Sequence, residues 1–153
     1  LSDTDHLWGM GGNSQWVWKT FLRGMNPLFM DPYDGVVIGK QFDPQWEPIR
    51  KSLGYALRYS RRVNMSKMVP HSDLTSSGYC LANRGSEYLV YLHEGGEVTL
   101  DLTPMQGKLS IEWFNPNTGE VKTDTDRGVS DGNKFVSPFA SSDALLFLKV
   151  TTR

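Results

Sequence analysis

The stretch Tyr88-Leu89-Val90-Tyr91-Leu92 decides how this sequence folds, because it is apolar or aromatic at every position. A strand with one solvated face would alternate between apolar and polar residues, so this run predicts a central strand that is covered on both faces. Turn residues bound it on each side, with Asn83-Arg84-Gly85 before it and Glu94-Gly95-Gly96 after it. The stretch therefore marks the middle of a sheet.

Further short strands are expected on both sides of this stretch. Alternation or short apolar runs predict them at residues 79–82, 98–102, 109–113, 134–136 and 144–150. Residues 120–125 are polar, with Lys122 among threonines, and predict an edge strand. Short strands with turns every ~8–12 residues are typical of an antiparallel β-sandwich, which we expect over residues 76–153.

The composition changes near residue 64, and the region before it predicts helices. Ser14 and Gly24 are the expected N-cap and C-cap of a helix over residues 14–23. Asp43-Pro44 opens a second helix, whose apolar stripe continues to residue 63. The apolar run at residues 28–30 predicts a buried strand between the two helices.

The order of strand end, helix, strand and helix is that of repeating βα units, in which the carboxyl ends of the strands carry the functional site. Two units are too few to close a barrel, so we expect residues 1–63 to be the C-terminal remnant of a (β/α)8 barrel. Residues 64–75 are the expected linker. The predicted fold class is α+β, with a C-terminal antiparallel β-sandwich preceded by two βα units.

Charge and composition exclude several classes of protein. The sequence has 16 Lys and Arg against 17 Asp and Glu, a formal net charge of −1, which argues against a nucleic-acid binder. No stretch approaches the ~20 apolar residues of a membrane span, and this segment contains no signal-peptide pattern. The single cysteine, Cys80, excludes an internal disulfide. We expect no metal, no cofactor and no membrane partner.

Two groups of polar residues follow the predicted strands of the first region. The first places two carboxylates and an imidazole within four residues, where they could act as acid, base or metal ligands or simply cap turns. The second is an Asp-Pro-Tyr-Asp-Gly turn, which ordinary turn chemistry also explains. A loop tryptophan after the first group could stack on a sugar ring. The candidate pocket residues are Asp3, Asp5, His6, Trp8, Asp31 and Tyr33, and no catalytic residue is assigned.

A pair of aromatic residues ends the predicted strand at 109–113. Trp113 and Phe114 are consecutive, so they point to opposite faces of the strand. We expect that only one of them belongs to the core, and the one that faces outward is a candidate binding platform. The alternative is an aromatic side chain that is partly covered.

Several runs of the sequence resemble a known family of enzymes. Asp3-Thr4-Asp5-His6-Leu7-Trp8-Gly9 and the runs at 16–24 and 26–33 closely resemble the final part of the apiosidase-like glycoside hydrolases, which are (β/α)8 barrels. The runs at 76–82, 87–92 and 98–102, with Trp113-Phe114-Asn115-Pro116, are similar to the β-sandwich that follows such barrels and is named for collagen binding.

This resemblance implies a C-terminal fragment of a glycoside hydrolase that acts on plant or complex polysaccharide side chains, with the β-sandwich buttressing the barrel. It places the candidate pocket residues at the sugar site and implies an extracellular or periplasmic location. The fragment alone is expected to be inactive, because most of the barrel's site lies outside it. The alternative is a non-catalytic module that binds carbohydrate or a fibrous protein such as collagen. Exposed apolar groups at Phe29, Trp46 and Leu53 predict self-association.

Overall fold

The computed structural model describes residues 2–3, 12–30, 44–129 and 133–151. The elements of the first region are β1 (Ser2–Asp3), α1 (Ser14–Leu22), β2 (Pro27–Leu28), the short 3-10 helix η2 (Pro44–Trp46) and α2 (Glu47–Ser60). Those that follow are β3 (Val69–Pro70), the 3-10 helix η3 (Ser72–Leu74), β4 (Cys80–Asn83), β5 (Glu87–Leu92), β6 (Glu97–Thr99), β7 (Lys108–Phe114), β8 (Val121–Gly128), β9 (Lys134–Val136) and β10 (Ala144–Thr151).

Most strands of the described chain join one six-stranded sheet in the order β3-β4-β5-β10-β7-β8, and all its pairs are antiparallel. Strand β5 is buried at every position and lies between β4 and β10, which confirms the predicted central strand. Strand β8 lies at the edge, and its residues 121–126 are exposed, as its polar sequence predicts. The chain is therefore an α+β protein dominated by an antiparallel sheet.

Each face of the six-stranded sheet carries its own apolar cluster. On one face, the side chains of Val90, Trp113 and Leu146 pack against the β6–β9 pair, which adds Val98 and Phe135. We call the cluster on the other face the helix-side core. It joins Leu89, Tyr91, Phe114, Leu145 and Phe147 of the sheet to Val17, Trp18, Leu22, Ile49 and Tyr59 of the helices.

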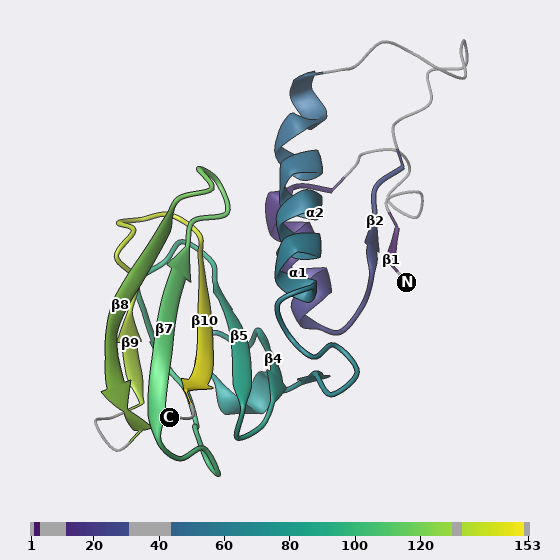
Figure 1. Ribbon diagram of the computed structural model, residues 1–153. Helices are drawn as coiled ribbons and strands as arrows, with labels where there is room; N and C mark the ends of the chain where they lie inside the picture. The colour runs from purple at the N-terminus through teal and green to yellow at the C-terminus, as the bar shows by residue number, and fades with distance from the viewer. Residues whose placement is uncertain (1, 4–11, 31–43, 130–132, 152–153) are drawn as a thin grey trace, which may run out of the picture.

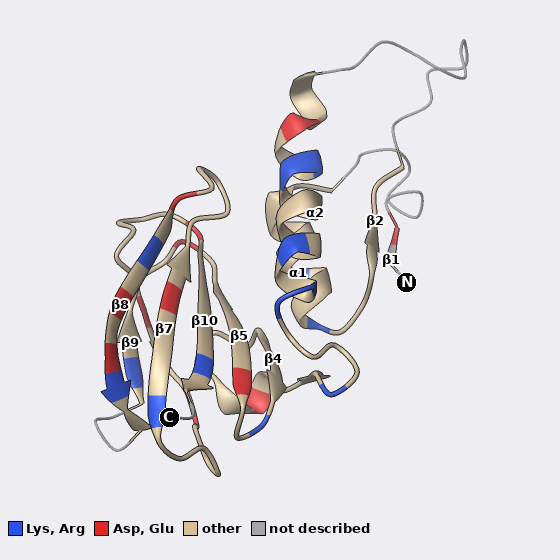
Figure 2. Ribbon diagram, in the orientation of Figure 1, with Lys and Arg blue, Asp and Glu red and all other residues tan. Residues whose placement is uncertain are grey.

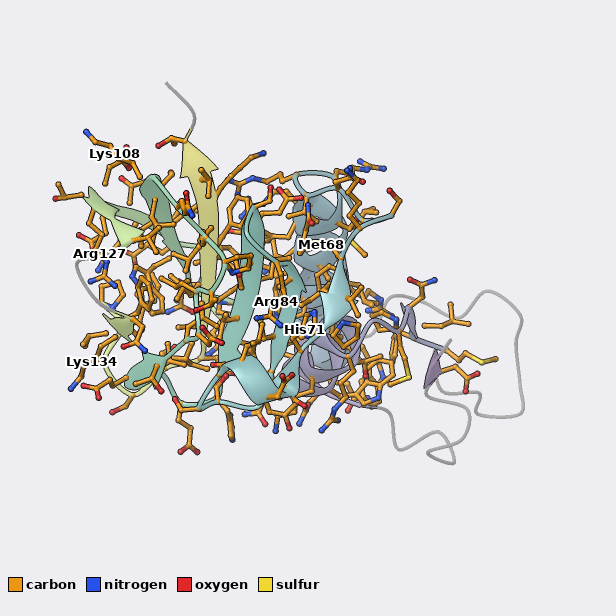
Figure 3. All side chains as sticks on the ribbon, turned by 90° about the horizontal axis from the view of Figure 1, so that it is seen from below. Met68, His71, Arg84, Lys108, Arg127 and Lys134 are labelled. Carbon is orange, nitrogen blue, oxygen red and sulfur yellow. The ribbon has the colours of Figure 1, made fainter. Side chains whose placement is uncertain are left out.

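Helices α1 and α2 lie side by side, between the sheet and the short β1–β2 pair (Figure 1). The view from below shows side chains filling the space between the helices and the sheet, with Met68 on the helix side (Figure 3). Met68 is itself buried in the helix-side core. The sheet is thus covered on both faces.

Local sequence explains where α1 begins and ends. Asn13, and not Ser14 as predicted, is the N-cap, because its side-chain Oδ1 accepts the backbone N–H of Trp16 at 2.8 Å. After the C-cap Arg23, Gly24 has a φ of +74°, a conformation that a side chain disfavours. A Cβ on Gly24 would also lie 2.8 Å from the ring Cγ of Pro70, so this glycine lets the two segments approach.

The first region has the predicted order of elements with shorter strands. The strand predicted at residues 28–30 is not buried, because Leu28 and Met30 are 44% and 45% exposed. β1 and β2 pair in parallel, Asp3 opposite Leu28, and α1 lies between them along the chain. The predicted linker at residues 64–75 contains β3, which pairs with β4, and η3. The division of the chain at residue 63 stays a prediction.

The apolar groups that are exposed differ from those expected. Phe29, Trp46 and Leu53 are partly buried and pack against the helix-side core. Phe29 and Trp46 contact each other with a ring-centroid distance of 5.6 Å. Large exposed apolar side chains lie instead at Met25, Leu28, Met30 and Leu57 of the same region.

Candidate binding groove between the helices and the sheet

Only one of the candidate pocket residues lies within the described chain. Asp3 ends β1 and is partly buried. The remaining candidates, Asp5, His6, Trp8, Asp31 and Tyr33, lie outside the described residues. Their role as a sugar pocket stays a prediction.

The binding platform predicted at Trp113 and Phe114 is wrong, because both side chains are buried. Trp113 is 2% exposed and lies in the cluster under the β6–β9 pair. Phe114 is 0% exposed and lies in the helix-side core, where Tyr55, Tyr59 and Trp18 surround it. The two residues do face opposite ways, but both faces of the sheet are covered.

A polar groove lies where the starts of the helices meet the loops at one end of the sheet. The register places these loops together, because Leu92 pairs with Ala144 and Leu145 pairs with Phe114, so that β5 and β7 end where β10 begins. A hollow of about 310 Å³ and a second of about 410 Å³ share Ser14 and Asn117. We call these two hollows together the junction groove. Its polar lining residues are Asn13, Ser14, Gln15, Glu47, Lys51, Glu94, Asn117, Ser141, Ser142 and Asp143.

Hydrogen bonds hold the sheet side of the junction groove in place. Asn115, which is buried, and Asn117 each donate an amide N–H to the hydroxyl oxygen of Ser142, at 3.2 Å in both cases. The carbonyl oxygen of the Asn115 side chain accepts the backbone N–H groups of Asn117 and Thr118 at 2.9 and 3.1 Å. The β7–β8 turn is therefore tied to the segment before β10.

A buried carboxylate supports the floor of the junction groove. Asp143 is 5% exposed, and its Oδ2 accepts the hydroxyl of Tyr91 at 2.8 Å. Its Oδ1 accepts the backbone N–H of Glu94 at 2.9 Å and lies 3.2 Å from Nδ1 of His93. Burial, followed by the hydrogen bond to Asp143 and its charge, raises the pKa of Tyr91 far above its ordinary value. Tyr91 therefore stays a proton donor to this carboxylate.

The helix side of the junction groove is fixed at the starts of both helices. Ser14, at the start of α1, donates its hydroxyl to the backbone oxygen of Pro48 at 3.3 Å. Lys51 lies 3.7 Å from Glu47, one turn away on α2. Both walls of the groove are thus tied to ordered elements.

An ion pair joins the end of α2 to the sheet at a distance from the junction groove along the helix. The Arg62 guanidinium donates to both oxygens of the Glu112 carboxylate, at 2.6 and 2.8 Å, and the Tyr59 hydroxyl donates to Oε1 at 2.8 Å. Burial tends to raise the pKa of Glu112, but the hydrogen bonds from Arg62 and Tyr59 and the nearby positive charges together hold it below its ordinary value. In Figure 2, basic residues lie along α2 and acidic residues lie on β5 and β7.

Among the described residues, no group of three or more His, Cys, Asp or Glu side chains is placed to hold a metal ion. Within the same part of the chain, every helix is too short or too polar to cross a bilayer. Cys80 is buried at 1% exposure, and burial raises the pKa of its thiol to about 12.

Sequence reasoning missed the junction groove. Its residues come from four separate segments around positions 14, 47, 94 and 117 and from a fifth before β10. Asn115-Pro116-Asn117-Thr118-Gly119 is visible in the sequence only as a turn. The strand register, which no local pattern specifies, brings these segments together.

The chain is similar to a described protein family over more than half of its length. The model of the family described as "Putative collagen-binding domain of a collagenase" matches residues 63–149. A comparison with curated proteins gave no match.

Two solved structures have a similar fold. A glycoside hydrolase family 5 protein from Bacteroides vulgatus ATCC 8482 matches 90% of this chain and 35% of its own length, with a TM-score of 0.67 and 15% identity. A second structure, described as a glycoside hydrolase, matches 83% of this chain and 33% of its own, with a TM-score of 0.54 and 14% identity. The chain thus spans about one third of each structure, and at these identities the likeness is one of fold.

Proposed function

This chain belongs to the family described as the "putative collagen-binding domain of a collagenase". From its fold likeness to two glycoside hydrolases we propose that it is the C-terminal part of such an enzyme. In this proposal residues 1–63 are the last two βα units of a (β/α)8 barrel, and residues 76–153 form an antiparallel β-sandwich that buttresses it. The substrate class is plant or complex polysaccharide side chains, and the location is extracellular or periplasmic.

The helix-side core is the observation that carries this proposal. Trp18 of α1 packs against Phe114 of β7 and Tyr91 of β5, with ring-centroid distances of 5.9 and 6.4 Å. Arg62 and Glu112 add a two-point ion pair between α2 and β7. A buttress needs a large, apolar and fixed contact of this kind, whereas domains that move against each other have smaller and more polar ones.

The parallel β1–β2 pair supports the barrel part of the proposal. Parallel strands joined through a helix are the repeating unit of (β/α)8 barrels, and a pair of two short strands is not stable alone. Leu28 of β2 and Leu57 of α2 are 44% and 51% exposed. Further βα units would cover such apolar side chains.

The polar candidates belong to this proposal as well. The carboxyl ends of β1 and β2 lead to the starts of α1 and α2, the end of a barrel at which active sites are built. We propose that Asp3, Asp5, His6, Trp8, Asp31 and Tyr33 line the sugar pocket there. The fragment alone would then be inactive, since the other units of the barrel complete the site.

Two measurements test the proposal. The coding sequence upstream of Leu1 should specify on the order of 200 further residues with a βα pattern. The complete protein should hydrolyse a plant polysaccharide, and Asp5→Ala or Asp31→Ala should lower its kcat/KM at least tenfold. An upstream region without that pattern, or unchanged kinetics in both variants, would contradict the proposal.

A second proposed function is a non-catalytic binding module for carbohydrate or for a fibrous protein such as collagen. The description of the matched family favours it. Titration of residues 1–153 with triple-helical collagen peptide by calorimetry tests the fibrous partner. A saturable heat would support this function, and the absence of heat would leave the buttress as the better proposal.

A further inference from the structure

We propose that the junction groove binds a neutral carbohydrate, so that the β-sheet part of the chain contacts a sugar itself. The choice of ligand is consistent with the proposed function and rests on it only in part, because the lining residues indicate the same class of ligand. The site lies on loops of the sheet and at the starts of the helices, and its lining residues are different from the candidate pocket residues.

The first support is an oriented donor. The Ser142 hydroxyl oxygen accepts one amide hydrogen from Asn115 and one from Asn117, which uses both of its lone pairs. Its own hydrogen must then point in the remaining direction, and Ser142 lines the junction groove. Among the described residues, no group accepts this hydrogen.

The second support is a set of unused groups beside that donor. Asn117 donates its amide to Ser142, which leaves its side-chain carbonyl oxygen as an acceptor next to the Ser142 hydroxyl. Asn13 uses its Oδ1 to cap α1, which leaves its amide N–H groups as donors. Within the described chain, the Gln15 amide has no hydrogen-bond partner either. A sugar hydroxyl both donates and accepts, so neighbouring ring hydroxyls can pair with such a mixed set.

The third support is the charge of the junction groove. Among the described residues, its lining includes the carboxylates of Glu47, Glu94 and Asp143 and one ammonium group, that of Lys51. Asp143 is already satisfied by Tyr91 and the Glu94 backbone. An excess of negative charge disfavours phosphate, sulfate or uronate ligands. A neutral polyhydroxylated ligand fits these groups better than an anion.

Size and rigidity agree with a sugar ligand. Pockets that hold small molecules have volumes of roughly 300–1,000 Å³, and the two adjoining hollows measure about 310 and 410 Å³. The bonds of Asn115 to Ser142 and of Ser14 to Pro48 fix both walls before binding, which lowers the entropy cost of binding. No aromatic side chain of the described residues lines either hollow. We therefore expect an affinity near 1 mM, from hydrogen bonds alone.

The test is a titration of the isotopically labelled chain, residues 1–153, followed by NMR. The probes are cellohexaose, xylohexaose and mannohexaose, with hexagalacturonate as the anionic comparison, each to about 10 mM. At a Kd of 1 mM this concentration fills about nine tenths of the sites. At least one neutral probe should shift the amide signals of residues 13–15, 115–118 and 141–143, and hexagalacturonate should not.

Variants locate the ligand. Ser142→Ala removes the oriented donor and should weaken binding roughly three- to tenfold. Gln15→Ala, on the opposite wall, should weaken binding by a similar factor. It replaces Ser142→Ala in the test if that variant does not fold. Ser66→Ala is the matched control, because within the described part of the chain this exposed hydroxyl bonds to Asn64 alone, in the turn after α2. Its affinity should equal that of the parent chain.

Three results would overturn the inference: no shift with any neutral probe, shifts confined to residues outside the junction groove, or equal affinity in all three variants. None of them depends on hydrolysis. If the chain binds a neutral sugar but the complete protein hydrolyses no polysaccharide, the proposed function is wrong and the inference about the junction groove is supported. If hydrolysis occurs without these shifts, the inference about the junction groove is wrong and the proposed function is supported.

Discussion

Gly119 and Tyr55 approach so closely that a Cβ on Gly119 would lie 2.5 Å from the Tyr55 hydroxyl oxygen and 3.2 Å from the ring carbon that carries it. The φ of Gly119 is +81°, which L side chains rarely adopt. Through this contact the β7–β8 turn packs closely against α2. The Tyr55 ring also contacts Phe114 edge-on, at 4.9 Å between ring centroids, so the turn and the helix-side core meet at this tyrosine.

Gly119→Ala should therefore destabilise the chain by more than the cost of placing a side chain at this left-handed φ. The left-handed φ costs about 1–2 kcal/mol for a residue with a side chain, and displacement of Tyr55 adds to that cost. Gly96→Ala is the matched control, since Gly96 has a φ of +80° and open space around its Cβ position. Urea denaturation should show the larger loss for Gly119→Ala, and equal losses would contradict the contact.

Glu112→Gln should lower the free energy of unfolding at neutral pH by about 1–3 kcal/mol, because the charged hydrogen bonds from Arg62 and Tyr59 weaken. The measurement is chemical denaturation at pH 7. Glu120→Gln is the control, as the exposed Glu120–Lys122 pair should contribute little. A loss as small as that of the control would show that the pair does not hold α2 to the sheet.

The same carboxylate predicts a pH dependence of stability. The pKa of Glu112 is lower in the folded chain than its ordinary value of 4.5, so its contribution is present above pH 4.5 and is lost as the pH falls through the folded pKa. Thermal unfolding of the parent chain should therefore become easier below about pH 4.5, and Glu112→Gln should flatten this change. A parallel decline in both proteins would assign the acid sensitivity to other groups.

Phe114→Ala should destabilise the whole chain by about 3–5 kcal/mol, because the ring is fully buried between helices and sheet. Val121, its partner across the β7–β8 ladder, is 44% exposed, and Val121→Ala should have a small effect. During unfolding, the helix content measured by circular dichroism and the tryptophan fluorescence should change together in one transition. Separate transitions, or protease cleavage between residues 63 and 76 that frees the helices, would contradict a shared core.

Cys80 should be unreactive in the folded chain at pH 7–8, because its thiol is buried and its pKa is raised to about 12. A maleimide reagent should label it only after denaturant unfolds the chain. Rapid labelling of the native chain would show that β4 opens without global unfolding.

The isolated chain should associate with itself through the apolar side chains around β2 and α2. Leu28→Lys and Leu57→Lys together should reduce the association, because both side chains are exposed. Val136→Lys is the control, since Val136 is 62% exposed on β9, on the other side of the sheet. Light scattering that shows a monomer at high concentration would contradict this prediction.

The sheet could be predicted from the sequence where burial follows directly from local pattern. The apolar run at 88–92 predicts the central strand β5, and the charged and threonine-rich run at 120–125 predicts the edge strand β8. In both cases the side chains of one strand are enough to predict its place in the sheet. Element bounds shifted by up to three residues. Asn13 caps α1 in place of Ser14, and α2 ends at Ser60 where the apolar stripe predicted residue 63.

The burial of Phe114 could not be predicted in the same way. The pattern at 109–113 alternates, which is typical of a strand with one solvated face. Phe114 is buried only because Trp18 and Tyr59, from helices far away along the chain, cover that face. No local pattern shows which distant helix will pack on a given strand.

The junction groove was beyond prediction for a related reason. Asn117 and Ser142 are polar residues in turns, and polar turns are common. They become a site only through the antiparallel register of β5, β10 and β7. A single sequence contains no measure of that register.

The place of β10 in the sheet has a consequence for biosynthesis. This strand is the last to be translated among those described, yet it lies between β5 and β7 and joins the two halves of the sheet. A nascent chain that ends before Ala144 would leave both neighbours with unpaired edges, which invite aggregation. The sheet can therefore close only after the ribosome has released residues 144–151, and a premature stop before them would direct the product to chaperones or proteases.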